Sequence, residues 1–390
     1  MTIESARNLR PFVTLERARD VVRLFTPNWF AVTMGTGILA VALGQFPQAP
    51  LLSSLGFSMW IFTCVLFVLS VLLYATRWII YFEGAKRVLS HSSMSMFLGC
   101  IPMALATVGN GMVLYGVPLF GETAVTIAFV IWWLDAGLAL ACGVGVPFFM
   151  FTRQSHSHEQ MTAIWLLPVV ASGVAATSGG LLLPHLASDL QFAALFVSYS
   201  LWAFSVPLAM GLIVVLVVRM IVHKLPPASM AASCWLALGP VASGALGMLL
   251  LGQHGPDILT ANGLGLYAPA IGGASLLTGF ILWGFGFWWL CLSTLITLRY
   301  FTQGVPFNLG WWAYTFPLGV YSLATLNLAH IVSLAPLSIF GAVLVGALAI
   351  VWCIVAARTF GGTWRGSLFH APCLETSEPV KTAQPGPITA

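Results

Sequence analysis

Charged residues are scarce in this 390-residue chain: Asp, Glu, Lys and Arg make up 7% of it, and hydrophobic residues 59%. With a mean hydropathy of +0.95, this composition excludes an ordinary soluble globule, in which about 25% of residues are charged. A helix that spans a bilayer needs about 20 mainly apolar residues. Ten such segments predict an all-α polytopic membrane protein. The predicted spans are residues 28–44, 53–76, 94–114, 122–150, 162–183, 190–218, 231–252, 271–298, 311–332 and 335–357.

The sequence also lacks the patterns that place catalytic chemistry in a chain. Its seven cysteines are single and scattered, without a C-x-x-C pair or a metal-ligand spacing, so we expect neither disulfides nor zinc. The eight histidines fall in loops, tails or the ends of spans, which leaves a haem without axial ligands. No H-E-x-x-H, G-x-S-x-G or P-loop pattern occurs. We therefore expect no enzyme and no cofactor, with a membrane oxidoreductase as a remote alternative.

Lys and Arg are absent from every second loop between the predicted spans. All 15 lie before the first span, after the last, or after the second, fourth, sixth and eighth. The opposite loops carry only Glu122, Asp189 and Asp257 as charged residues. By the positive-inside rule both termini are cytoplasmic, and we expect a plasma-membrane protein, in a bacterium the inner membrane. These loops also account for the net charge of +4, so no nucleic-acid partner is expected.

Three regions follow from this topology: a cytoplasmic N-terminal segment over 1–26, a transport domain over 27–358 and a cytoplasmic tail over 359–390. Residues 10–25 place apolar side chains near one face and arginines largely elsewhere, which predicts a short amphipathic helix on the cytoplasmic leaflet. The polar, proline-containing sequence from about residue 375 predicts a disordered tail.

One residue position, which we call the mark, recurs inside every second span, at intervals of 66 to 77 residues. The marks are Met34, Pro102, Pro168, Pro240 and Pro317. A repeat of this length indicates one supersecondary unit used five times, and we predict five helical hairpins with quasi-five-fold symmetry around a central pore. A proline inside a spanning helix breaks its hydrogen-bond ladder, so we expect kinks at the four prolines. Small residues and prolines are common in membrane helices generally, which leaves unrelated spans as the alternative.

The odd-numbered spans contain no Lys, Arg, Asp or Glu. Their small residues allow close approach of helices, whereas the bulky tryptophans of the even spans, such as Trp132 and Trp352, are expected to face lipid or neighbouring subunits. A wall of hydroxyl and amide groups binds ions weakly, which suits rapid passage. The candidate pore-lining residues are Thr33, Thr36, Thr107, Asn110, Ser172, Thr177, Ser178, Ser243, Thr325 and Asn327.

One carboxyl group, that of Asp135, lies inside the fourth predicted span. An intramembrane acid is by default a functional hypothesis, here a proton-coupling or substrate-linked site. The alternative is a protonated or hydrogen-bonded side chain that ties its helix to a neighbour. We favour the alternative because the fourth span is of the outer type.

Three segments resemble a known family: NWFAVTMGTGILA at 28–40, PFNLGWWAYTFPLGVYSLATLNLA at 306–329 and TWRGSLFHAPC at 363–373. From about residue 24 to 373 the chain resembles the tellurite-resistance/dicarboxylate transporter family, which includes plant slow anion channels, fungal malate permeases and fungal sulfite pumps. The resemblance implies five helical hairpins around a pore lined by the odd helices, and commonly a homotrimer with one path per subunit.

The resemblance also implies that a phenylalanine on the ninth helix closes the pore, at the position of Phe316. The residues that precede the five marks support this assignment separately, because only Phe316 among them is aromatic. The alternative is that Phe316 packs between helices at a proline kink.

The function we expect is transmembrane transport of a small anion. The candidates are a C4-dicarboxylate such as malate, sulfite, or an inorganic monovalent anion such as chloride or nitrate. The odd spans offer no fixed positive charge to pair with a dicarboxylate, which favours monovalent anions or weak acids. Two mechanisms stay open: a passive channel, and a proton-coupled exporter of sulfite or a dicarboxylate with Asp135 as the coupling group.

Overall fold

In the computed structural model, residues 11–375 are described and form helices and turns without a strand. Five inner elements each begin with a 3-10 helix and continue as an α-helix. They are η1 (Pro27–Trp29) with α3 (Phe30–Leu43); η3 (Met94–Gly99) with α6 (Cys100–Gly111), η4 (Met112–Gly116) and α7 (Val117–Phe120); η5 (Ala163–Leu166) with α9 (Leu167–Leu182) and η6 (Leu183–His185); η7 (Ala228–Ala237) with α11 (Leu238–Ala261); and η9 (Leu309–Tyr314) with α13 (Phe316–Val332).

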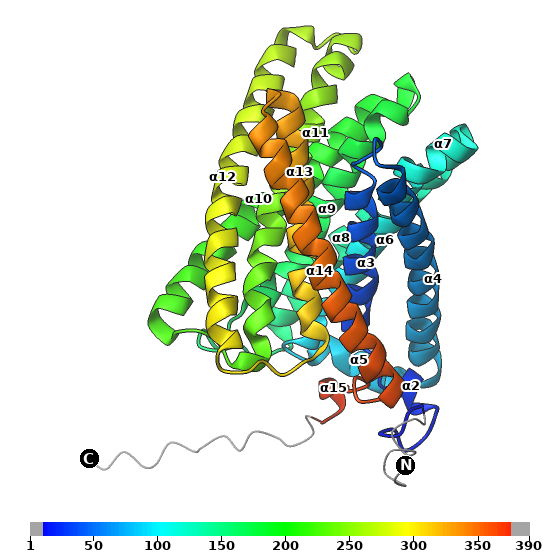
Figure 1. Cartoon of the computed structure of the whole chain (residues 1–390), viewed down its shortest axis with the longest axis vertical. Helices are drawn as coiled ribbons and strands as arrows, with labels where there is room; N and C mark the ends of the chain where they lie inside the picture. Colours follow the sequence, from blue (N-terminus) through cyan, green and yellow to red (C-terminus); the bar gives the residue numbers. More distant parts are fainter. Residues whose placement is uncertain (1–10, 376–390) are drawn as a thin grey trace.

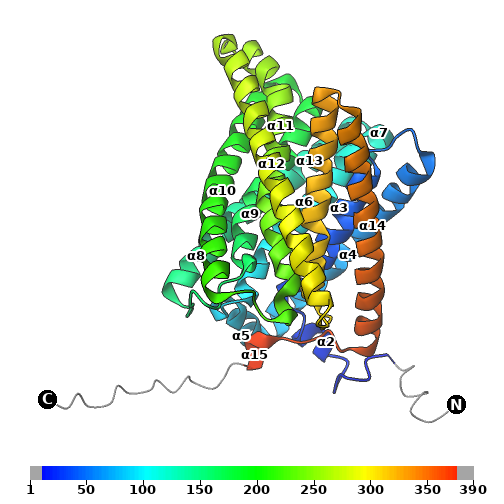
Figure 2. The same ribbon diagram turned by 60° about the vertical axis from the view of Figure 1, so that its left-hand side comes forward.

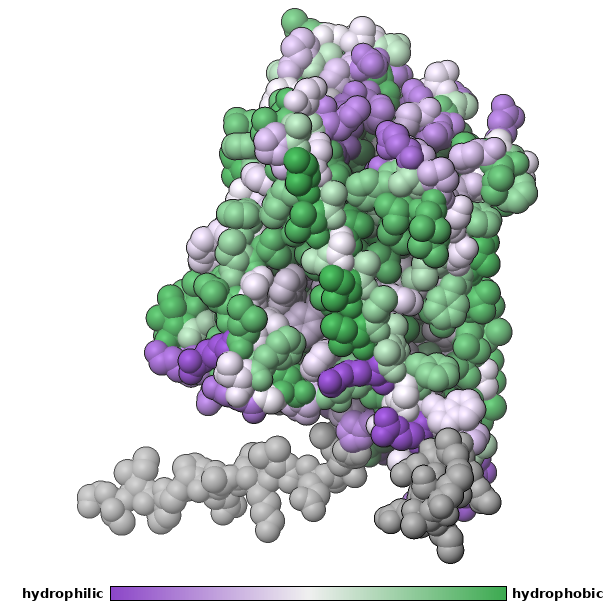
Figure 3. All heavy atoms as spheres, in the orientation of Figure 1, coloured by the Kyte–Doolittle hydropathy of each residue, from purple (hydrophilic) through white to green (hydrophobic). Residues whose placement is uncertain are grey.

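Five long outer helices alternate with the inner elements. They are α4 (Pro50–Ile80), α8 (Glu122–Thr152), α10 (Ser188–His223), α12 (Ala268–Phe301), preceded by η8 (Gly265–Tyr267), and α14 (Ala335–Arg365). Each of the ten predicted spans overlaps one element. Between residues 11 and 375, nine segments are long and apolar enough to cross a membrane, and Pro27–Leu43 is a shorter apolar helix. Figure 3 shows hydrophobic residues over the middle of the visible face and hydrophilic residues toward both ends. The chain is an all-helical, multi-pass membrane protein.

The inner elements contact one another in a closed series, which we call the inner ring. α3 packs against α6, α6 against α9, α9 against α11 and α11 against α13, which returns to α3. In Figure 1 α4 and α12 flank α3, α6 and α9, and in the turned view of Figure 2 α10 and α14 do so. The apolar stretch of Ala163–His185 is 94% buried, whereas that of Pro50–Ile80 is 22% buried. The odd-numbered elements are thus more buried than the even-numbered helices, as the sequence predicted.

The four marker prolines lie where the helix changes type. Pro168 and Pro317 are the second residues of α9 and α13, and Pro102 and Pro240 are the third residues of α6 and α11. The first N–H groups of an α-helix lack intrahelical partners, so a residue without an N–H costs little there. The break expected at each proline therefore takes the form of a transition from 3-10 to α-helix.

A tryptophan on every outer helix donates its indole N–H to the next inner element, and α14 bonds back to α3. A buried indole N–H needs an acceptor, and the inner ring supplies a backbone carbonyl or a threonine hydroxyl. The expectation that these rings face lipid is wrong for Trp132 and Trp352, although the adjacent Trp133 is 45% exposed. The five bonds join Trp60 to Val108 O (3.1 Å), Trp132 to Ala175 O (2.9 Å), Trp202 to Gly244 O (3.0 Å), Trp283 to Thr325 Oγ1 (3.0 Å) and Trp352 to Thr36 Oγ1 (3.1 Å).

The N-terminal segment contains less helix than predicted. Within residues 11–25, the described part of this stretch, only α2 (Asp20–Arg23) is α-helical. Phe12 and Thr14 donate their backbone N–H groups to carbonyls at the end of α14, at 2.7 and 3.1 Å. Because the backbone is committed to these bonds, residues 11–14 form turns in place of a helix. The tail beyond residue 375, predicted to be disordered, lies outside the described residues.

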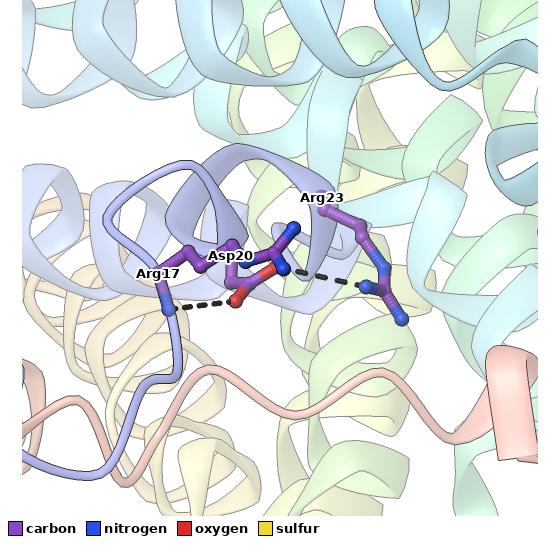
Figure 4. A network of polar contacts seen from close by, with 3 residues as sticks. All are labelled: Arg17, Asp20 and Arg23. Atoms are coloured by element: carbon purple, nitrogen blue, oxygen red, sulfur yellow. Dashed lines mark hydrogen bonds and ion pairs between the residues drawn. The ribbon is translucent and has the colours of Figure 1, made fainter.

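Asp20 organises the turn that leads into the first span. Its carboxylate accepts a hydrogen bond from the backbone N–H of Arg17 at 3.0 Å and lies 3.6 Å from the guanidinium of Arg23 (Figure 4). This is the one ion pair within residues 11–375. α2 and α15 (Pro372–Glu375) lie at the same end of the bundle (Figure 1), as an even number of spans requires.

Candidate functional site

A cavity of about 520 Å³ lies at the end of the inner ring where all five inner elements begin, and we call it the vestibule. Each inner element contributes residues from its 3-10 segment, and the segment after α14 completes the wall. The lining residues are Asn28, Ala31, Met34, Ser93, Met94, Phe97, Cys100, Ile164, Leu167, Ser229, Met230, Ala232, Ser233, Leu236, Phe307, Asn308, Leu309, Gly310, Ala313, Ser367, Leu368, His370 and Pro372.

The lining of the vestibule is mostly apolar, with neutral polar side chains set among the apolar ones. None of its described lining residues is Asp, Glu, Lys or Arg. Its polar side chains are amides, hydroxyls and one imidazole, from Asn28, Ser93, Ser229, Ser233, Asn308, Ser367 and His370. The N-terminus of a helix carries unsatisfied N–H groups and a partial positive charge that favour an anion. The partial charges at five such ends favour an anion over a cation in this cavity.

Asn308 shows how the rim is built. It stands immediately before η9 in an extended conformation, and its side-chain oxygen accepts a hydrogen bond from the N–H of Gly310 at 2.7 Å. Asn is a favoured residue at this capping position because its side chain satisfies a free N–H group. Its amide nitrogen donates to the carbonyl of Ser229 at 3.0 Å, which ties η9 to η7. The rim is thus fixed between two neighbouring inner elements.

Residues 366–375, which we call the C-terminal strap, run along the vestibule. Gly366 has a φ of +85°, a left-handed conformation that glycine adopts without strain, and it turns the chain at the end of α14. The ring of Phe369 stacks on that of Trp29 with centroids 4.9 Å apart and meets Phe12 edge-on at 6.2 Å. These contacts hold the strap against the first inner element.

Arg77, on α4, is fully buried and anchors the strap from the other side. Its guanidinium donates to the carbonyls of Phe25 (2.7 Å) and Gly84 (3.3 Å) and to the sulfur of Cys373 (3.5 Å). No carboxylate pairs with it among the described residues. One buried cation therefore joins the turn before the first span, the segment after α4 and the strap. Sequence reasoning used Arg77 only to orient the chain and missed this role.

Phe316 lies just beyond the vestibule. Ala313, which lines the cavity, precedes it by three residues, and residues three apart in a helix share a face. The side chain of Phe316 is 3% exposed. A methyl group added at Gly239, on the neighbouring α11, would meet only Pro317 and Val170 within 4 Å, both at 4.0 Å. The space beside Gly239 is thus largely unfilled, and it lies next to Pro317, the residue that follows Phe316.

The residues predicted to line a pore lie outside the vestibule, and all except Asn110 fall into two groups. The first group donates to backbone carbonyls: Thr36, Thr107, Thr177, Ser243 and Thr325. The second group is buried with a side-chain oxygen that has no hydrogen-bond partner: Thr33, Ser172, Ser178 and Asn327. A buried polar group without a partner is costly, so Thr33, Ser172 and Asn327 are the better candidates to contact a passing ion or water, whereas Ser178 lines a separate cavity.

Asp135 and Asn110 lie away from the vestibule. They line a second, small cavity together with Ser178, between α6, α8 and α9. The side chain of Asp135 is 1% exposed, and neither of its oxygens has a hydrogen-bond partner. The predicted hydrogen bond from Asp135 to a neighbouring helix is therefore absent within residues 11–375. No group of three or more metal-binding side chains occurs in the same part of the chain.

The similarity of this chain to known proteins extends over all five inner elements. A family model described as SLAC1, voltage-dependent anion channel, matches residues 24–360. The sulfite efflux pump SSU1 of Trichophyton rubrum is 37% identical over 364 residues, 91% of this chain and 96% of the pump. The sulfite efflux pump SSU1 of Arthroderma otae is 36% identical over 353 residues, 88% of this chain and 92% of the pump. The malic acid transport protein of Schizosaccharomyces pombe is 23% identical over 343 residues, 85% of this chain and 76% of that protein.

Proposed function

Because the chain belongs to the SLAC1 voltage-dependent anion channel family, we propose that it exports a small monovalent oxyanion such as hydrogensulfite, the singly protonated form of sulfite. The resemblance to transporters of this family, seen in the sequence, is confirmed, and the protein is an anion transporter or channel without enzymatic activity. The anion enters the vestibule from the cytoplasm, passes Phe316 and leaves along the axis of the inner ring.

The vestibule is the main observation that supports this proposal. Five helix N-termini, together with neutral amides and hydroxyls, attract an anion without a fixed charge that would trap it. Its volume of about 520 Å³ admits a small anion together with several waters, since one water takes up about 30 Å³. Entry is favourable and release stays easy, which is the balance that conduction requires.

The choice of anion follows from the missing arginine and lysine. A dicarboxylate such as malate is recognised strongly by a guanidinium or ammonium group for each carboxylate, and no such group lines the vestibule. A monovalent anion needs fewer charged partners. Malate is therefore the weaker substrate in this proposal, although a malic acid transport protein is among the relatives.

Phe316 closes the path in this proposal. A hydrophobic ring at a narrow point excludes water and thereby blocks an ion that must stay hydrated. Phe316 lies one turn beyond Ala313, which lines the vestibule, and the space beside Gly239 is largely unfilled. Both observations support this role. The cytoplasmic side of the vestibule follows from the positive-inside rule, and quasi-five-fold symmetry and a homotrimer stay part of the proposal.

The test is the flux of four anions from liposomes that contain the purified protein. Chloride, nitrate, sulfite and malate are loaded in turn at equal concentration, and the efflux of each is recorded at a fixed membrane potential. We expect sulfite and the small inorganic anions to leave faster than malate. Malate flux above that of all three small anions would contradict the proposed substrate class.

A further inference from the structure

A second cavity lies behind the wall of the inner ring, where α8 packs against α6 and α9. Its volume is about 10 Å³, which is about the space of one water molecule. Three side chains supply its polar lining: Asp135 from α8, Asn110 from α6 and Ser178 from α9. The indole N–H of Trp132 also borders it but is committed to the carbonyl of Ala175 at 2.9 Å.

Three polar atoms of this cavity have no hydrogen-bond partner within residues 11–375. Both carboxyl oxygens of Asp135 and the hydroxyl of Ser178 are buried without a hydrogen bond. An isolated carboxylate in such surroundings is strongly unfavourable, whereas a neutral acid that bonds to one water is tolerated. The site is thus built for a carboxyl group that holds a proton.

No cation is available to stabilise the ionised acid. α6 and α9, the two inner helices that face Asp135, contain no Asp, Glu, Lys, Arg or His. α8 itself adds Cys142 and, at its first residue, Glu122, and α6 adds Cys100. The charged residues of α10 lie at its two ends. Within residues 11–375, the proton is therefore the cation that this pocket accepts most readily.

We propose that Asp135, Asn110, Ser178 and one water form a proton-binding site that loads and unloads during anion transport. This inference rests on the proposed function and extends it from a passive path to a proton-coupled one. Loss of the proton leaves an anion that must recruit the Asn110 amide, the Ser178 hydroxyl and the water as donors. Because those groups stand on α6 and α9, the ionisation of Asp135 changes how α8 holds two helices of the inner ring.

The experiment uses liposomes loaded with nitrate and a pH-sensitive dye, because nitrate carries no proton of its own. In wild type we expect protons to move together with nitrate. In Asp135→Asn we expect the proton movement to be lost while downhill nitrate flux persists. Asp189→Asn, at an exposed position at the start of α10, is the matched control and should keep wild-type proton movement.

Infrared spectroscopy of the same samples supplies a readout that does not depend on transport. The carbonyl stretch of a protonated carboxyl group should be present in wild type, absent in Asp135→Asn and shifted in Ser178→Ala. An unchanged band in Asp135→Asn, proton movement equal to wild type in that variant, or nitrate flux that requires sodium would overturn the proton site. Absence of nitrate flux in every variant would contradict the proposed function, and the infrared band would still decide the proton site.

Discussion

The vestibule and the level one turn beyond it are built from the same five inner elements, yet they differ in chemistry. The lining of the vestibule combines neutral polar side chains, such as Asn28 and Ser229, with apolar ones around about 520 Å³ of space. The first α-helical turns beyond it supply buried apolar groups such as Phe316, Met103 and Val170. In the proposed mechanism, access and closure therefore depend on different residues of the same helices, so each can be changed without the other.

The largest expected effect comes from removing the proposed closure. Phe316→Ala should raise anion flux about tenfold or more, because a barrier lower by about 1.4 kcal/mol corresponds to a tenfold rate. The measurement is the current through the reconstituted variant at fixed potential. Phe196→Ala, on the exposed face of α10, is the control and should leave the current unchanged. Equal currents in Phe316→Ala and wild type, with both well folded, would refute the closure.

Adding a side chain at Gly239 should narrow the proposed path. Gly239→Leu places an aliphatic side chain in the space beside Pro317 and Val170, and we expect the flux of the Phe316→Ala variant to fall about tenfold when it is added. Gly211→Leu on α10, where an added methyl group would meet nothing within 4 Å, should have no effect. Undiminished flux in the Phe316→Ala, Gly239→Leu double variant would place the path elsewhere.

A smaller effect is expected at the anchor of the C-terminal strap. Arg77→Met leaves the buried carbonyls of Phe25 and Gly84 without their donor, and each lost partner costs about 1–3 kcal/mol. The melting temperature in detergent should fall, and the strap should become accessible to protease. The control is Arg87→Met, at an exposed position of η2 (Arg87–Ser90) after α5 (Phe82–Lys86). A melting temperature equal to that of wild type would show that the strap is held by other contacts.

The smallest effect concerns the rim of the vestibule at acid pH. Burial lowers the pKa of the His91 imidazole from its ordinary value of 6.5, although a hydrogen bond to its own backbone opposes this shift. Its Nδ1 accepts hydrogen bonds from the N–H groups of Ser93 and Met94, at 3.1 and 3.2 Å. The neutral ring is required, so this stabilisation is complete above about pH 6.5 and is lost as the pH falls through the lowered pKa.

We expect the melting temperature of wild type to fall between about pH 7 and about pH 5 by an amount equivalent to at most about 1 kcal/mol. His91→Asn keeps an acceptor that does not titrate and should remove part of this dependence. The same pH profile in both proteins would show that His91 does not report the state of the rim.

Hydropathy and the distribution of Lys and Arg were sufficient to predict all ten helices, because lipid imposes length and polarity on every span. The small residues of the odd spans predicted which helices are buried, since close packing requires them. The vestibule could not be predicted, because Asn28, Ser229 and Asn308 stand at span ends that resemble ordinary loop residues. Their convergence depends on ring closure, which is a long-range property.

The tryptophans were misread for a related reason. Composition places bulk on the even spans, and a one-dimensional pattern does not show which face of those helices turns inward. The recurrence of a tryptophan at intervals of 69 to 81 residues, from Trp60 to Trp352, was a usable signal in the sequence. Asp135 was singled out from its chemistry alone, whereas Asn110 and Ser178 were assigned to the pore wall, because only the structure places them in the same cavity as Asp135.

The most direct test of the account is whether a charged thiol reagent applied at the vestibule blocks the anion current. Ser229→Cys is introduced at the exposed rim of the vestibule in the Phe316→Ala background, and Phe316→Ala alone shows what the native cysteines contribute. We predict that a negatively charged methanethiosulfonate reagent on the cytoplasmic side reduces the current of the double variant far more than that of its parent. Equal currents after complete labelling of Ser229→Cys would contradict the claim that the vestibule is the entrance of the anion path.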